Sequence, residues 1–184
     1  MATGLISDFN LLATTDRGFE SEASSELWIL LREIGDQRPL IDRAPVRGVV
    51  LARISLDPLE AISRLRNGLR TSQQDFRCLY RIIPVEKVVP SEIKSIVDAA
   101  RELASKIGDG DSFKITVEKR RTALSGRELI TAIAEGIDRR VDLEDPDWVI
   151  LVEIVGRLTG VSVVHPDSLL NVQKERAKLP SNGQ

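Results

Sequence analysis

The order of strand-like and helix-like segments in the first 84 residues limits the folds that this chain can adopt. The strand-like segments, which are β-branched or apolar, are residues 9–15, 39–42, 46–54 and 77–84. Apolar residues recur at helical spacing in residues 18–35 and again after Asp57. The resulting β-α-β-β-α-β order predicts a ferredoxin-like domain, in which two helices cover one face of a four-stranded antiparallel sheet.

Capping residues mark the start of two helices. Asp57 is followed by a proline at the first helical position and by a glutamate three residues after the cap, and Asn67-Gly68 is the expected end of that helix. Ser125 and Glu128 form the same kind of capping box, so a further helix is expected from Gly126 to about residue 138.

The second half of the chain has a different order of elements. We expect a link at residues 85–90, a helix over 91–107, and strands at 112–118, 148–155 and 161–164. The sequence therefore predicts an α/β (α+β) protein with two domains that have separate cores and share no sheet. These are a ferredoxin-like domain at 1–84, a mixed α/β domain at 85–165, and a partly disordered C-terminal tail at 166–184.

Charge is distributed unevenly along the chain. The formal net charge is −2, yet residues 64–81 and residues 114–127 each carry +4, which leaves −10 for the rest. A polyanion responds to such local concentrations of charge. An ordinary solvated face explains either island about as well. The candidate RNA-binding residues are Lys114, Lys119, Arg120, Arg121, Arg127, Arg64, Arg77 and Arg81.

The second island combines charged side chains with a helix start. Lys119, Arg120 and Arg121 precede the helix that begins at Gly126, and Arg127 lies in its first turn. The free N–H groups and the positive dipole end of a helix already favour a phosphate. We expect these residues to bind the backbone of a nucleic acid and to position it without reading its sequence.

The sequence lacks the motifs of common enzyme active sites. Its Gly-x-Gly at residues 108–110 has Phe113 where a dinucleotide-binding loop needs another glycine. Neither a Gly-x-Ser-x-Gly elbow nor a His-Glu-x-x-His zinc motif occurs. The single cysteine, Cys78, excludes an internal disulfide and a cysteine-based metal cluster, and is interpreted as a small apolar strand residue.

The remaining candidates for chemistry have simpler explanations. The single histidine, His165, follows the last strand and is interpreted as a hydrogen-bonded or exposed strand-end residue. The acidic residues at 142–147 precede a strand, where such residues usually form turns. We therefore expect no catalytic residues, no metal and no cofactor, and hence no enzyme activity of the chain by itself.

Neither a membrane segment nor a secretory signal is expected. No apolar run reaches the roughly 18–20 residues that a membrane span needs. Residues 1–10 lack the charged, apolar and small-residue order of a signal peptide. The expected location is the cytoplasm.

The second half resembles the THUMP domain over about residues 85–165. The similarity lies in Phe113 to Arg121, Ser125 to Ile137, Val141 to Asp147 and Ile150 to Ile154. The resemblance implies tRNA binding, with a preceding ferredoxin-like domain helping to hold the acceptor end. It also implies that Lys119, Arg120, Arg121 and Arg127 face the RNA.

Most THUMP proteins continue into a catalytic domain, whereas this sequence ends about 19 residues after His165. It therefore resembles the stand-alone adaptor group that supports N4-acetylation of cytidine in tRNA by a separate acetyltransferase. On this basis the chain is expected to present tRNA, through its phosphate backbone, to such an enzyme.

Two alternatives remain open at this point. In the first alternative, the chain is a tRNA-binding subunit of a split methylation or thiolation enzyme. In the second, it is a small-molecule-sensing ferredoxin-like regulator in which the basic islands are incidental. An RNA-recognition module of the same topology is excluded, because its central strands carry base-stacking aromatics and Leu11 to Thr14 and Val49 to Ala52 contain none.

Overall fold

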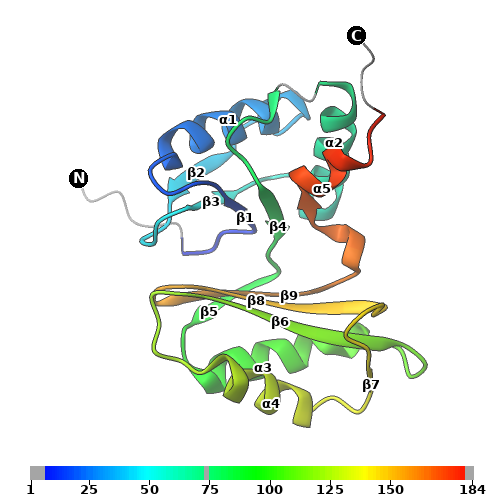
Figure 1. The fold of residues 1–184 in the computed structure, drawn as a ribbon. Coiled ribbons are helices and arrows are strands. Elements are labelled where there is room, and N and C mark those ends of the chain that lie inside the picture. Colours follow the sequence, from blue (N-terminus) through cyan, green and yellow to red (C-terminus); the bar gives the residue numbers. More distant parts are fainter. Residues whose placement is uncertain (1–6, 73–74, 181–184) are drawn as a thin grey trace. The chain divides into compact units, whose positions relative to one another are not determined.

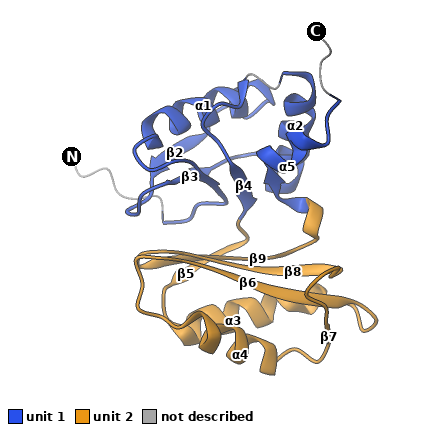
Figure 2. Ribbon diagram, viewed as in Figure 1, with its two compact units in different colours: residues 1–84, 168–184 blue, residues 85–167 orange. Residues whose placement is uncertain are grey.

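The computed structural model describes residues 7–72 and 75–180 (Figure 1). The chain divides into two compact units, residues 1–84 with 168–184 and residues 85–167 (Figure 2). Each unit has its own five-stranded sheet and its own hydrophobic core.

The sheet of the first unit has the strand order β10-β4-β1-β3-β2, with every neighbouring pair antiparallel. Its strands are β1 (Leu11–Thr14), β2 (Leu40–Arg43), β3 (Val49–Arg53), β4 (Arg81–Pro84) and β10 (Leu170–Asn171). The helices are α1 (Glu20–Glu33) and α2 (Pro58–Thr71). The order of the first four strands and two helices confirms the ferredoxin-like prediction.

One face of this sheet forms the core with α1 and α2. Leu11, Ala13 and Ile82 point from the strands toward Leu27 of α1 and Leu65 of α2. The carboxylate of Asp57 accepts a hydrogen bond from the Glu60 N–H at 3.0 Å, as the capping motif predicted. The helix continues past the expected end at Asn67-Gly68, because Leu69 is fully buried in the core and stabilises another turn.

The C-terminal segment, expected as a partly disordered tail, forms a strand and a helix within residues 168–180. Strand β10 pairs with β4, and α5 (Val172–Ala177) follows it. Leu170 and Val172 are fully buried in the core of the first unit. Residues 168–176 contain three apolar residues, Leu169, Leu170 and Val172, in an otherwise polar stretch. They are too few to give a periodic signal, so the sequence pattern did not reveal this ordered segment.

Arg66 of α2 connects the C-terminal segment to the rest of the unit. Its guanidinium donates a hydrogen bond to the carbonyl of Leu169 at 2.9 Å and forms an ion pair with Glu175 at 3.2 Å. Both side chains of the pair are largely shielded from solvent. Such shielded, charge-assisted hydrogen bonds are stronger than those at an open surface.

The second unit has the strand order β5-β9-β8-β6-β7. Its strands are β5 (Lys87–Pro90), β6 (Ser112–Arg120), β7 (Arg140–Val141), β8 (Trp148–Val155) and β9 (Leu158–Val164). Helices α3 (Ile93–Leu103) and α4 (Gly126–Glu135) pack on one face of the sheet. Single 3-10 turns are formed by Ala104–Lys106 and Pro166–Ser168.

Strands β6 and β8 are parallel over eight residue pairs, from Phe113 opposite Trp148 to Arg120 opposite Val155. Parallel neighbours need a long crossover connection, and α4 supplies it. Helix α4 ends beside α3, where Arg101 donates to the carbonyl of Ala132 at 2.7 Å. A side chain at Gly136 would collide with Arg101, because a Cβ there would lie 2.0 Å from its Nε.

Residues 85–90 are not merely a link. Their last four residues form β5, which pairs with β9 at the edge of the sheet. The segment is short and enclosed by Pro84 and Pro90, so its alternation was too brief to indicate a strand. Strand β9 likewise begins earlier than expected, at Leu158, because Gly156 adopts a φ of 71° and allows a tight turn after β8.

Replacing Arg66 with alanine is expected to lower the free energy of unfolding by roughly 2 kcal/mol, because Glu175 and the Leu169 carbonyl lose a shielded charged donor. Arg70→Ala is the matched control, since Arg70 is exposed in the last turn of the same helix and the expected change is within about 0.5 kcal/mol. Urea unfolding followed by circular dichroism measures both. Equal stabilities would show that Arg66 does not hold the C-terminal segment.

Candidate nucleic-acid interface

The end of β6 and the start of α4 bring the predicted basic residues together. Lys119 and Arg120 are the last two residues of the strand, and Arg127 is exposed in the first turn of the helix. The hydroxyl of Ser125 accepts a hydrogen bond from the Glu128 N–H at 3.2 Å, which confirms the predicted cap. The helix therefore starts with its positive end beside the basic loop.

Lys119 lies directly along the start of α4. A Cβ placed on Gly126 would be 3.5 Å from Cδ of Lys119, so the aliphatic part of the lysine runs past the first helical residue. The ammonium group and the N-terminal dipole of α4 thus contribute positive potential to the same region. An anion bound there would interact with a flexible cation and with backbone N–H groups.

Arg121 has an unusual backbone conformation at the end of β6. Its φ is 56°, and among the residues that the structure describes it is the one non-glycine residue with a positive φ. This left-handed conformation costs an L-residue roughly 1–2 kcal/mol. Strained residues of this kind concentrate at functional sites, so the conformation favours a binding role for this loop.

Arg120 is committed to an ion pair within the unit. Its Nη1 lies 2.8 Å from Oε2 of Glu153 on β8. The side chain of Arg120 is 19% exposed and that of Glu153 only 3%. Glu153 thus pairs with a cation of the neighbouring strand, whereas a phosphate contact of Arg120 stays a prediction. Its primary role here is to neutralise a buried carboxylate.

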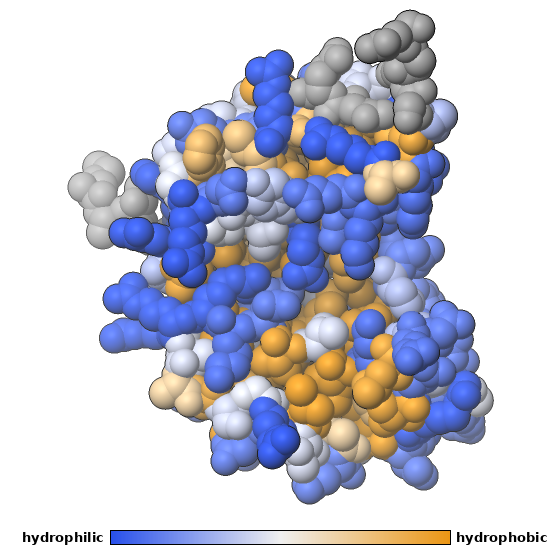
Figure 3. Space-filling model, viewed as in Figure 1, coloured by the Kyte–Doolittle hydropathy of each residue, from blue (hydrophilic) through white to orange (hydrophobic). Residues whose placement is uncertain are grey.

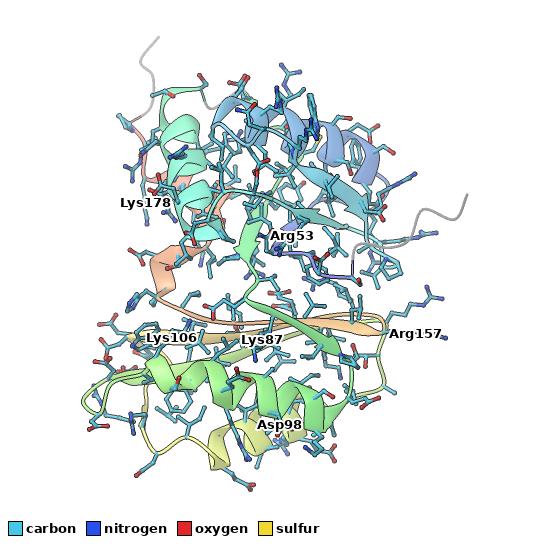
Figure 4. All side chains as sticks on the ribbon, turned by 180° about the vertical axis from the view of Figure 1, so that it is seen from behind. Arg53, Lys87, Asp98, Lys106, Arg157 and Lys178 are labelled. Atoms are coloured by element: carbon cyan, nitrogen blue, oxygen red, sulfur yellow. The ribbon has the colours of Figure 1, made fainter. Side chains whose placement is uncertain are left out.

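Arg157 is a basic residue of this region that the sequence reasoning missed. It is exposed in the turn between β8 and β9 and extends outward from the end of that hairpin (Figure 4). The neighbouring Gly156 N–H donates to the carbonyl of Arg120 at 3.0 Å, so the turn lies next to the end of β6. The parallel pairing of β6 and β8 would have indicated this proximity. We call Lys119, Arg120, Arg121, Arg127 and Arg157 the basic cluster.

Lys114 lies apart from the basic cluster. It is half-buried near the start of β6, six residues before Arg120. At about 3.3 Å per residue, this separates the two positions by about 20 Å along the strand.

The three predicted residues of the first unit do not form one surface. Arg64 pairs with Glu60 at 2.8 Å and donates to the carbonyl of Ile34 at 2.9 Å, so it secures the end of α1. Arg77 lies among acidic residues beside α1. Arg81 is half-buried in β4, adjacent to Ile82, which faces the helices, so its side chain lies on the opposite face of the sheet. An RNA contact of any of them stays a prediction.

The acidic stretch and the histidine are engaged by hydrogen bonds within the unit. The carboxylate of Asp142 accepts from the N–H groups of Asp145 at 3.0 Å and Glu144 at 3.1 Å, and these bonds lower its pKa. Asp147 accepts from the N–H and hydroxyl of Ser112, with the same effect on its pKa. His165 is hydrogen-bonded to the Asp147 carbonyl at 2.9 Å and lies against Trp148.

Other cations of the second unit form ion pairs near α3. Lys106 contacts Glu86 and donates to the Val163 carbonyl at 2.7 Å, and Lys87 pairs with Glu102; the two lysines lie beside α3 and its 3-10 extension (Figure 4). In Figure 3, hydrophobic atoms gather among hydrophilic ones on the visible face of this unit. The large apolar residues exposed on α4, on β7 and just after β7 are Ile130, Val141 and Leu143.

Within residues 7–72 and 75–180, no group of three or more histidine, cysteine or acidic side chains is arranged to hold a metal ion. No helix in the same ranges is long and apolar enough to cross a membrane.

The second unit is thus a two-layer α/β module with a basic cluster at one end of its sheet. Residues 90–164 match the family model of the THUMP domain. The chain therefore contains a THUMP domain, as the resemblance predicted, and the matched residues lie within the second unit. Among curated proteins, none matches this sequence.

Solved structures share the fold at low sequence identity. PH1313 from Pyrococcus horikoshii superposes with a TM-score of 0.61 at 17% identity, over 85% of this chain and 54% of its own. TrmN from Thermus thermophilus gives 0.52 at 16%, over 83% and 44%. A protein described as a possible methylase from Clostridium difficile gives 0.53 at 13%, over 85% and 41%. The chain thus spans about half the length of these proteins or less.

Replacing Arg120 with alanine is expected to lower the free energy of unfolding by about 2–4 kcal/mol, because it leaves the Glu153 carboxylate buried without its cation. Lys119→Ala is the matched control: it removes an equal charge from the adjacent, exposed position and should change stability by no more than about 0.5 kcal/mol. Denaturant unfolding measures each. The double variant R120A/E153Q should recover part of the loss, and full additivity of the two changes would contradict a direct pair.

Proposed function

We propose that this protein binds tRNA through the basic cluster and presents it to a separate tRNA-modifying enzyme, without catalysing the modification itself. The observation that carries the proposal is that Lys119, Arg121 and Arg157 gather at or next to the end of β6, where α4 begins with Arg127 in its first turn. These residues come from three separate stretches of the chain. They meet in a unit whose family model is the THUMP domain.

The geometry supports binding to phosphates. Four cations of the cluster are exposed: Lys119, Arg121, Arg127 and Arg157. The N-terminus of α4 adds backbone N–H donors at the same place. Base-stacking aromatics are not part of the cluster, so the contact is expected to position the RNA backbone. The rest of the chain is acidic, which makes the cluster the favoured region for a polyanion.

Several observations support a non-catalytic role. The carboxylates of Asp142 and Asp147 are engaged by backbone N–H groups, and a ring nitrogen of His165 is engaged by a carbonyl. Their hydrogen bonds explain their positions without any chemistry on a substrate. The enzyme that we propose as the partner is a cytidine N4-acetyltransferase acting on tRNA. A partner that methylates or thiolates tRNA is the alternative.

Changing Lys119, Arg121 and Arg127 together to alanine should flatten the log–log salt slope of tRNA binding by about 2–3 units, because each exposed cation releases about one counterion from a phosphate. Arg120 is left in place because its removal would also destabilise the unit. The change Arg157→Ala alone should reduce the slope by about 0.7–0.9. Titrations of labelled tRNA at several salt concentrations measure these slopes.

The control for this experiment removes the same total charge elsewhere. Arg38, Arg70 and Lys94 are exposed outside the basic cluster, and R38A/R70A/K94A should leave the slope nearly unchanged. A slope that is the same for wild type and K119A/R121A/R127A would place the RNA site elsewhere. Equal flattening by both triple variants would show that only the net charge matters.

The purified chain mixed with tRNA and either acetyl-CoA or S-adenosylmethionine should give no modified nucleoside. Addition of the tRNA cytidine acetyltransferase from the same genome should give N4-acetylcytidine, and the yield at low tRNA concentration should fall with K119A/R121A/R127A. Mass spectrometry of digested tRNA detects the product. Modification by the chain alone would refute the adaptor role, and methylation or thiolation with a different partner would favour the alternative.

A further inference from the structure

The exposed side of α1 in the first unit carries large apolar residues. Trp28 is 48% exposed, Ile29 is 51% exposed and Leu40 of the neighbouring strand β2 is 60% exposed. Together with Pro39 and Ile41 they line a shallow hollow of about 600 Å³ between α1 and β2. Exposed apolar residues gathered in this way, as opposed to scattered singly, are typical of an interaction surface.

A second hollow of about 470 Å³ continues this surface on the other side of Ile29. Ser25 and Ile29, one helical turn apart, line both hollows and form the ridge between them. The second hollow is bordered by acidic residues, with Arg77 as one cation among them. These acidic residues are Glu22, Glu26, Glu33 and Asp75. We call the two hollows together the α1 groove.

The tryptophan of the groove is held in place before any partner binds. The guanidinium carbon of Arg32 lies 5.8 Å from the centre of the Trp28 ring, and the same guanidinium donates to the carbonyl of Gln37. The cation over the ring therefore restrains the indole next to the hollow. Pre-organised tryptophans of this kind contribute much of the binding energy at protein interfaces.

The order of strands leaves the rest of the groove accessible. Strand β2 pairs with β3 on one side only, and within the described part of the chain no strand pairs with its other edge. Hydrophobic atoms are also visible over α1 among hydrophilic residues in Figure 3. Apolar side chains and backbone groups of β2 are thus open to the same partner.

The charge of the groove selects the kind of partner. Four carboxylates around one hollow repel the phosphates of RNA, whereas they attract lysine and arginine side chains. We propose that the α1 groove is the docking site for the modifying enzyme, which inserts a segment with apolar anchors flanked by basic residues. This inference rests on the proposed function, in which such an enzyme is the partner, and assigns its contact to α1 and β2.

The test measures two affinities for each variant of the full chain, one for tRNA and one for the purified tRNA cytidine acetyltransferase of the same genome. W28S/I29S should weaken enzyme binding roughly tenfold or more and leave tRNA affinity unchanged. E22Q/E33Q should weaken enzyme binding several-fold at low salt, and the difference should vanish at high salt. Glu26 is left unchanged because its carboxylate accepts from the N–H groups of Cys78 and Leu79.

The matched control is Leu143→Ser, which removes an apolar side chain that is 72% exposed in the second unit. Its affinities should equal those of the wild type. Thermal unfolding and tRNA binding of the same samples show whether W28S/I29S is folded. If it is not folded, the enzyme affinity of E22Q/E33Q tests the docking proposal. The wild type should also be a monomer by light scattering.

Three results would overturn the docking proposal, and they separate it from the proposed function. If both groove variants bind the enzyme as the wild type does, the adaptor role stands and the contact lies elsewhere. If the wild type binds tRNA but not the enzyme, the docking proposal and the acetyltransferase adaptor role both fail while RNA binding stands. A wild-type dimer that W28S/I29S converts to a monomer would assign the groove to a second copy of this chain.

Discussion

The parallel pairing of β6 with β8 is the constraint on which the basic cluster depends. Two parallel neighbours end at the same edge of a sheet, so the loop after β6 and the turn after β8 must lie together. The crossover between them requires a helix, and the N-terminus of α4 consequently begins next to that edge. Cations that are distant in sequence, such as Lys119 and Arg157, come together for this reason. The Arg120–Glu153 pair connects the same two strands and neutralises the one carboxylate buried between them.

The sequence predicted the elements with strong periodicity and clear caps. The ferredoxin-like order, the Asp57 and Ser125 caps and the long strand β8 all follow from residue patterns that local physics determines. What the patterns could not supply was pairing between distant segments. Strand β5 and strand β10 are short and owe their conformation to β9 and β4, respectively. No local rule indicates a strand of two residues such as Leu170 and Asn171.

Only part of the candidate site could be predicted from the sequence. Charge counting identified Lys119, Arg121 and Arg127, since they are adjacent to a recognisable helix start. It gave no sign that Arg120 is paired with a buried carboxylate on another strand. It also included Arg64, which secures the end of α1, and missed Arg157, an isolated cation in a turn. A count of charges along a sequence therefore does not show which cations the fold engages in ion pairs.

The C-terminal segment has a consequence for the order in which the protein matures. Residues 168–184 belong to the first unit, so the THUMP domain is inserted between two parts of one folding unit. During synthesis, α1, α2 and four strands of the first sheet leave the ribosome early, whereas β10 and α5 follow only after the whole second unit has been made. Until then the edge of β4 remains uncovered and Arg66 lacks Glu175. A nascent chain therefore passes through a stage in which the inserted domain can be complete while the domain that surrounds it is not.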